Sequence, residues 1–271
     1  MWTLTPSLLD DLARDLARSP LLVVTGAGIS LASGIPTFRG SDPGAVWAAD
    51  VTALGTRAYF EEEPAASWAW YLKRFGALAG KEPNAAHLAL AALERISERA
   101  GREVLLVTQN VDTLHEQAGS RALVKVHGSA DRVRCSRVGC VHGAPRGSLP
   151  RADFDVSALI ADPVDDNVPR CPACGSYLRQ HVLWFDEYYT EHEDYQYARV
   201  ERAQRRAAAV LFVGTSFAVG VTDNVLSASA GRVPVWSIDP AGEAPHRAVR
   251  VIAGKAEEVL PEAVARVDAA T

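Results

Sequence analysis

The sequence has no apolar run long enough for a membrane, no excess of basic residues and few cysteines. A membrane-spanning helix needs roughly 18–20 apolar residues, so no membrane association is expected. The 271 residues carry a formal net charge of −5, whereas nucleic-acid binders usually present a basic face, so nucleic acid is not an expected partner. The N-terminus, with Asp10, Asp11 and Asp15, lacks the basic-then-apolar layout of a secretory signal. We therefore expect a cytoplasmic protein.

The four cysteines occur as two short-spaced pairs. Cys135 and Cys140 are separated by four residues, and Cys171 and Cys174 by two. Disulfides are rare in cytosolic proteins, whereas two such pairs supply the tetrahedral thiolate set that zinc prefers. Because all four positions are cysteine, no coordination site is left open for substrate. The sequence therefore predicts one structural Zn²⁺ per chain.

Short apolar segments alternate with helical patterns along the chain, and the sequence contains no internal repeat or low-complexity linker. This alternation predicts an α/β fold with a Rossmann-like, doubly wound parallel sheet and a small zinc-binding module. Helical spacing of apolar residues marks 6–18, 84–101 and 256–267. The expected strands are 21–24, 104–108, 123–126, 208–213 and 233–238, with a last short strand at 248–252.

Three parts of the chain differ in composition. Residues 1–40, 84–130 and 181–271 are assigned to the Rossmann-like domain, and the segment 131–180, rich in Pro, Gly, Arg and Cys, to the zinc module. Residues 41–83 contain many aromatic side chains. They are consistent either with the wall of a cleft or with a helical pair packed by its aromatic rings.

A glycine turn directly follows the first expected strand. Gly26-Ala27-Gly28 leads into a helical turn that Gly34 and Pro36 end almost at once. A strand, a glycine turn and a helix start bring backbone N–H groups to a nucleotide phosphate. Position 31 is Leu, which departs from the usual dinucleotide fingerprint. A tight strand-to-helix connection without a ligand is the alternative.

Polar side chains follow other expected strands, at the edge where open α/β sheets bind ligands. Gln109, Asn110 and Asp112 suit a ribose or an amide, although such residues also cap helices. His127 closes a strand before a glycine and is a candidate general base; a structural role is the alternative. Gly214-Thr215-Ser216 offers further donors, whereas His87 and His115 lie within helices and are interpreted as structural.

Taken in order, these motifs resemble those of the sirtuins over residues 20–260. They are 26–30 (Gly-Ala-Gly-Ile-Ser), 33–39 (Ser-Gly-Ile-Pro-Thr-Phe-Arg), 108–112 (Thr-Gln-Asn-Val-Asp), Leu114-His115, His127-Gly128, the cysteine pairs and 214–216. Sirtuins are NAD-dependent protein lysine deacylases with a large Rossmann-type domain and a small zinc module. The resemblance implies NAD as cofactor, nicotinamide and O-acyl-ADP-ribose as products, and acyl-lysine proteins or peptides as partners of a monomer.

The resemblance also implies roles for individual residues. His127 would be the catalytic base, with Asn110 and Asp112 also in the catalytic set. The stretch 181–187 resembles the strand that pairs with the substrate peptide, through Val182, Trp184 and Phe185. The residues implied in NAD binding are Gly26, Ala27, Gly28, Ser30, Pro36, Phe38, Arg39, Trp47, Gln109, Asn110, Asp112, Gly214, Thr215, Ser216, Asp239 and Ala256.

Two positions depart from the family pattern. Asp186 stands where the family commonly has glycine, which puts the fit of the peptide in doubt. Asp239 stands where the family usually has asparagine. A carboxylate can still accept hydrogen bonds from ribose hydroxyls, so NAD binding is expected to survive this change.

A further likeness concerns the acyl group. Tyr71 and Arg74, with Thr37 and the 83–87 motif, resemble the sirtuins that remove succinyl and malonyl groups. Residues three apart share a helix face, and a guanidinium suits a carboxylate. As an alternative, Arg74 is a solvated helix residue.

Two other functions remain open: an ADP-ribosyltransferase or NAD hydrolase on the same scaffold, and a non-catalytic NAD sensor.

Overall fold

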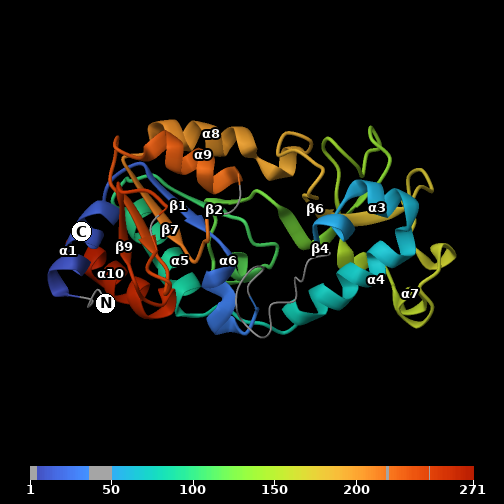
Figure 1. Ribbon diagram of the computed structural model, residues 1–271, viewed down its shortest axis with the longest axis horizontal. Coiled ribbons are helices and arrows are strands. Elements are labelled where there is room, and N and C mark those ends of the chain that lie inside the picture. The colour runs from blue at the N-terminus through green and yellow to red at the C-terminus, as the bar shows by residue number, and fades with distance from the viewer. Residues whose placement is uncertain (1–4, 37–50, 218–219, 244) are drawn as a thin grey trace.

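A computed structural model describes residues 5–36, 51–217, 220–243 and 245–271. A large parallel sheet with its helices occupies one end of the molecule, and a small antiparallel sheet with α3, α4 and α7 occupies the other (Figure 1). No helix among the described residues is both long and apolar enough to span a bilayer.

The large sheet confirms the expected α/β class. Its six strands are all parallel, in the order β3-β2-β1-β7-β8-β9. The strand order reverses between β1 and β7, which is the switch point where doubly wound sheets bind nucleotides. The strands are β1 (Leu21–Thr25), β2 (Val104–Thr108), β3 (Leu123–Lys125), β7 (Ala209–Val213), β8 (Val235–Ile238) and β9 (Val249–Ile252).

Helices cover both faces of this sheet. Because side chains alternate along a strand, Leu21 and Val23 of β1 enter one apolar cluster while Leu22 and Val24 enter the other. α1 (Pro6–Leu16), α5 (Ala85–Arg99) and α10 (Ala256–Ala269) pack on the first face, and α8 (Tyr197–Arg206) and α9 (Gly220–Ser229) on the second (Figure 1). Burial on both faces explains why these strands are continuous apolar runs.

The small module is built on an antiparallel sheet of order β5-β4-β6. Its strands are β4 (Gly128–Cys135), β5 (Leu149–Pro150) and β6 (Leu178–Val182). The module therefore starts before and ends after the expected limits 131–180. The reason is strand pairing: Gly128 lies opposite Val182, so the two chain crossings between the domains are themselves part of the small sheet.

The described part of the aromatic segment, from residue 51 onward, forms a packed helical pair. α3 (Arg57–Glu62) and α4 (Pro64–Phe75) follow the single turn α2 (Val51–Leu54). Trp68 is fully buried and donates its indole N–H to the Leu178 carbonyl at 2.7 Å. Phe60 and Tyr71 enter the same apolar cluster as the small sheet. α4 thus completes the core of the zinc module.

The remaining elements are short. They are the 3-10 helices η1 (Ala27–Ser33), η2 (Gly76–Leu78), η3 (Arg151–Asp153), η4 (Asp165–Asn167) and η5 (Glu193–Tyr195), and the helices α6 (Leu114–Gln117) and α7 (Ser157–Ala161).

Candidate active site

The carboxyl ends of β1, β2 and β7 bring three of the predicted segments together. Thr25 lies opposite Thr108 on one side and Val213 on the other. The next residues are joined as well: the Gln109 N–H donates to the Thr25 carbonyl, and the Gly26 N–H to the Val213 carbonyl, both at 3.0 Å. The segments starting at 26, 109 and 214 therefore leave the sheet side by side.

Gly26 and Gly28 lie where the chain after β1 contacts the chain after β7, and this contact leaves no room for a side chain. The Gly28 N–H donates to the Gly214 carbonyl at 2.9 Å. A Cβ on Gly28 would lie 2.7 Å from the Gly214 Cα, and one on Gly26 would lie 2.7 Å from the Gly214 oxygen. Gly214 itself has φ +57°, which favours glycine. The turn after β1 is therefore packed tightly against the chain that follows β7.

A buried polar network lies beneath this turn. The Asn110 amide donates to the Gly26 carbonyl at 3.1 Å and to the Ser30 hydroxyl at 3.2 Å. Ser30 in turn donates to an Asp112 carboxylate oxygen at 3.1 Å. The other Asp112 oxygen accepts the Leu114 N–H at 3.0 Å, so this carboxylate also caps α6. Amide, hydroxyl and carboxylate converge at the switch point, a donor and acceptor set that fits ribose and carboxamide groups.

The other residues implied in cofactor binding lie along the same edge. The Gln109 side chain donates to Thr25 O and Thr215 Oγ1, both at 3.3 Å. Asp239 directly follows β8, where its carboxylate accepts the Ala241 N–H at 2.9 Å. Ala27 is half-buried at the start of η1, Pro36 follows η1 half-buried, and Ser216 is exposed beyond β7. Ala256 is the first residue of α10, and its side chain is buried in the apolar core. Phe38, Arg39, Trp47 and Thr37 lie outside the described residues.

His127 has a defined tautomer. Its Nδ1 lies 2.8 Å from the Gln109 carbonyl oxygen, which can only accept, so Nδ1 carries the proton. The lone pair is then on Nε2, where the Tyr189 hydroxyl lies 3.3 Å away. Burial lowers the pKa of His127 to about 4. The imidazole is therefore neutral at pH 7 and can accept a proton.

His87 lies in α5 and His115 in α6, so both are in helices, as predicted from sequence. Both are buried, with their rings 4.8 Å apart, and His115 Nε2 contacts the Thr25 hydroxyl at 3.0 Å. His87 completes a capping box with Asn84 at the start of α5. Burial lowers the pKa of His87 to about 4.

Tyr71 and Arg74 share one face of α4. Tyr71 is 5% exposed and stacks on Trp184 with ring centroids 6.3 Å apart. Burial raises the pKa of Tyr71, and the charge of Arg179 opposes this shift. The Arg74 guanidinium lies 3.6 Å from the centroid of the Trp70 ring and is half-buried. Burial lowers the pKa of Arg74.

The stretch 181–187 is not one strand. β6 ends at Val182, because the Leu183 N–H turns to the His127 carbonyl at 2.9 Å and the Phe185 N–H to the Gly55 carbonyl at 3.0 Å. Val182 and Trp184 are buried in the module core, whereas Phe185 is 47% exposed. The chain here follows His127 and α3 instead of continuing as a free strand.

The aspartate at position 186 has a partner on α3. Its two carboxylate oxygens accept the N–H groups of Arg57 at 2.8 Å and Ala58 at 3.2 Å. Asp186 thus caps the N-terminus of α3 from a distant segment. No pattern in the sequence indicates this contact, since the residues are 129 and 128 positions apart.

Glu187 is the centre of a buried ionic cluster. Its side chain accepts hydrogen bonds from Arg134 at 3.0 Å, from Arg57 at 2.9 Å and, at short range, from Arg179. The Trp184 N–H adds a bond at 3.1 Å. Burial alone would raise the pKa of Glu187, but the Arg179 and Arg134 charges outweigh it and hold the pKa at about 2. The loop after β6 is therefore anchored in the module.

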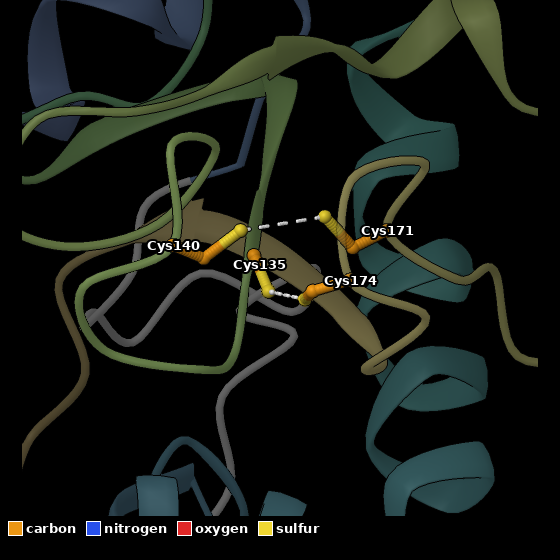
Figure 2. Close-up of side chains that lie close together, drawn as sticks. All are labelled: Cys135, Cys140, Cys171 and Cys174. Carbon is orange, nitrogen blue, oxygen red and sulfur yellow. Dashed lines mark hydrogen bonds between the residues drawn. The ribbon is translucent and has the colours of Figure 1, made fainter.

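The four cysteines converge as predicted (Figure 2). The sulfurs of Cys135 and Cys174 are 3.5 Å apart, and those of Cys140 and Cys171 are 3.7 Å apart. A tetrahedron with Zn–S bonds of about 2.3 Å requires sulfurs separated by about 3.8 Å, whereas a disulfide needs about 2.05 Å. The sulfur set fits a structural zinc ion.

A second group of possible metal ligands combines His181, His192 and Asp194. Hydrogen bonds join its members to one another and to Ser148. The Asp194 carboxylate lies 3.1 Å from His181 Nε2 and accepts the Ser148 hydroxyl at 2.9 Å, while its N–H donates to His192 Nδ1 at 3.2 Å. Burial lowers the pKa of both histidines, and the charge of Arg134 also acts to lower it. A cation there would meet this like charge.

Comparison with known proteins agrees with this geometry. The profile of the Sir2 family matches residues 26–221. An NAD-dependent protein deacylase from Pyrococcus furiosus is 36% identical, over 95% of this chain and 97% of that protein. NAD-dependent protein deacylase 1 from Pseudomonas aeruginosa is 38% identical, over 91% and 93%. The crystal structure of a Sir2 homolog–NAD complex superposes with a TM-score of 0.77 at 33% identity, over 99% of this chain and 95% of that one. The chain belongs to the Sir2 family.

Proposed function

We propose that this chain removes acyl groups with a distal carboxylate, such as succinyl and malonyl, from the lysine side chains of proteins. The reaction class follows from family membership: the chain is an NAD-dependent protein deacylase. The proposal adds the acyl preference. The observation that carries it is the placement of Tyr71 and Arg74 three residues apart on α4, with Tyr71 stacked on Trp184.

The edge of the large sheet would hold the cofactor. Two neighbouring strand ends present a hydroxyl, an amide and a carboxylate group, from Ser30, Asn110 and Asp112. A third strand end adds the hydroxyl of Thr215. When bound, NAD supplies an activated ribose carbon and nicotinamide as the leaving group. The expected products are nicotinamide and O-acyl-ADP-ribose.

His127 would move the proton. Its Nε2 lone pair is available at neutral pH, because Nδ1–H is committed to the Gln109 carbonyl and the pKa lies near 4. Nε2 can take a proton from a ribose hydroxyl and so make that oxygen a nucleophile. The resulting imidazolium remains hydrogen-bonded at Nδ1.

Side chains of α4 would recognise the acyl group. A carboxylate near the aromatic cluster of Trp70, Tyr71 and Trp184 loses part of its hydration, and an unpaired buried charge is costly. The Arg74 guanidinium and the Tyr71 hydroxyl supply the compensating donors. An acetyl group has no such charge and gains nothing from Arg74.

The test compares succinyl-, malonyl- and acetyl-lysine peptides of one sequence with NAD. Arg74→Met is expected to weaken desuccinylation by about 2–4 kcal/mol, on the order of 30- to 1,000-fold in kcat/KM, with a far smaller loss of deacetylation. Lys73→Met, which removes the neighbouring exposed cation of α4, is the matched control and should change neither. A parallel fall of both activities in Arg74→Met contradicts the proposed preference.

A further inference from the structure

The Nε2 atom of His127 already has a partner in the protein. Since Nδ1–H donates to Gln109, Nε2 can only accept, so the contact at 3.3 Å requires the Tyr189 hydroxyl to donate. The two rings also stack, with centroids 5.8 Å apart and planes 18° from parallel. The lone pair that family chemistry needs is therefore covered by a phenol.

Tyr189 is held from two helices. Its ring stacks on Tyr197 of α8 at 4.5 Å and 11°, and it packs against the apolar cluster that contains Val221 and Val225 of α9. Tyr197 is fixed in turn, because its hydroxyl accepts the Asn224 amide at 2.6 Å. Tyr189 also follows the anchored Glu187 by only two residues in the chain. Its position over Nε2 is thus determined by packing on several sides.

We propose that Tyr189 is a positioning residue for His127, holding the imidazole in the base-competent tautomer and covering its lone pair until a ribose hydroxyl replaces the phenol. The inference rests on the proposed role of His127 as the proton acceptor. It assigns a function to a residue that the sequence motifs did not indicate.

A phenol suits this task because it both donates and accepts hydrogen bonds. Its O–H group donates to the neutral Nε2. Burial raises the pKa of Tyr189 to about 12, so the phenol stays neutral at working pH. Burial lowers the pKa of His127 and the hydrogen bond to the Gln109 carbonyl raises it, and no charged side chain of the described residues is among the causes.

The hydrogen bond from Tyr189 shifts the pKa of His127 in a direction that can be measured. Donation to neutral imidazole stabilises the unprotonated form and lowers the pKa of His127. Tyr189→Phe keeps the stacked ring and removes the hydroxyl that donates to Nε2. It is expected to raise the pKa of His127 by about 0.5–1 unit, since one net hydrogen bond changes proton affinity roughly 3- to 10-fold.

The experiment is an NMR titration of ¹³C-histidine-labelled protein, with the His127 signal assigned by its loss in His127→Ala. Tyr188→Phe is the matched control: this neighbouring tyrosine is 73% exposed and should leave the His127 titration unchanged. No acyl substrate is used, so the outcome does not depend on whether the proposed acyl preference holds.

Enzyme kinetics supply the second readout. In Tyr189→Phe the acid limb of kcat/KM should move to higher pH by the same 0.5–1 unit, because this profile reports the free enzyme's base. Tyr189→Leu, which also removes the stacked ring, should lower kcat roughly 10-fold through misplacement of the imidazole, with KM for NAD little changed. An unchanged His127 titration in Tyr189→Phe, or an equal shift in Tyr188→Phe, overturns the proposal.

Discussion

The two ends of the molecule are stabilised in different ways. The parallel sheet is buried between two apolar clusters that cover both faces, so its polar residues are free for function. The small module has a three-stranded sheet and one apolar cluster, supplemented by four converging thiols and by Glu187 with its arginines. Where apolar area is limited, polar and metal-binding groups stabilise the fold. Substitution of a polar residue should therefore unfold one end and only inactivate the other.

The largest effect is expected for Cys171→Ala. The substitution leaves three thiolates, and structural zinc contributes roughly 10–16 kcal/mol of apparent binding free energy that is also folding free energy. The small module should unfold while the parallel sheet stays folded. Hydrogen exchange of β4 and β6 against β1 and β7 measures this difference.

Metal analysis completes that experiment. Wild type should contain about one zinc per chain, from the four-ligand set, and Cys171→Ala should contain none. Equal protection of the small sheet in both proteins would show that zinc is not what stabilises this end.

Glu187→Gln should have the next largest effect on stability. Removing this carboxylate leaves Arg134 and Arg179 buried without their counter-ion, which costs about 3–5 kcal/mol. Denaturant unfolding at pH 7 measures the loss. Glu193→Gln is the control, because its ion pair with Arg146 is exposed and contributes little.

The same residue predicts a pH dependence. The folded pKa of Glu187 is lowered to about 2, from an ordinary value of 4.5. Its contribution to stability is therefore fully present above pH 4.5 and is lost as the pH falls from 4.5 toward 2. Wild type should lose more stability than Glu187→Gln across this window, and equal slopes would place the acid sensitivity elsewhere.

His127→Ala tests the other side of the comparison. The parallel sheet does not depend on this side chain, so the variant should fold and bind NAD. Deacylation should fall by about 10²- to 10⁴-fold, as for loss of a general base. Calorimetric titration measures NAD binding, and steady-state turnover of an acyl peptide measures deacylation, so the two properties are tested separately. Substantial turnover in a folded variant removes His127 from the mechanism.

The smallest effect is expected for Asp186→Ala. This side chain, in the loop after β6, caps α3, and loss of a cap costs about 1 kcal/mol. Asp186→Asn keeps an acceptor oxygen and should recover part of the loss in denaturant unfolding. If Asp186→Ala and Asp186→Asn have the same stability, the cap does not hold the loop.

The parallel sheet could be predicted from sequence almost residue by residue. Its strands are local runs of apolar residues such as 21–25 and 209–213, buried on both faces, and short-range pattern determines them. The cysteine pairs were equally readable, because ligand spacing is a local property. The limits of the small module were not, since the pairing of Gly128 with Val182 joins distant parts of the chain.

By itself the sequence determined the α/β class, the thiolate set and which side chains stand at the carboxyl ends of the strands. Only the tertiary structure decided what those side chains touch: Asp186 on α3, Glu187 among arginines, and Tyr189 over the base of His127. Apart from Arg179, which is 8 positions from Glu187, these contacts join residues 53 to 130 positions apart, and no periodicity links such positions. Strand and ligand spacing are set by neighbours along the chain, whereas hydrogen bonds between loops are set by how the packed elements place them.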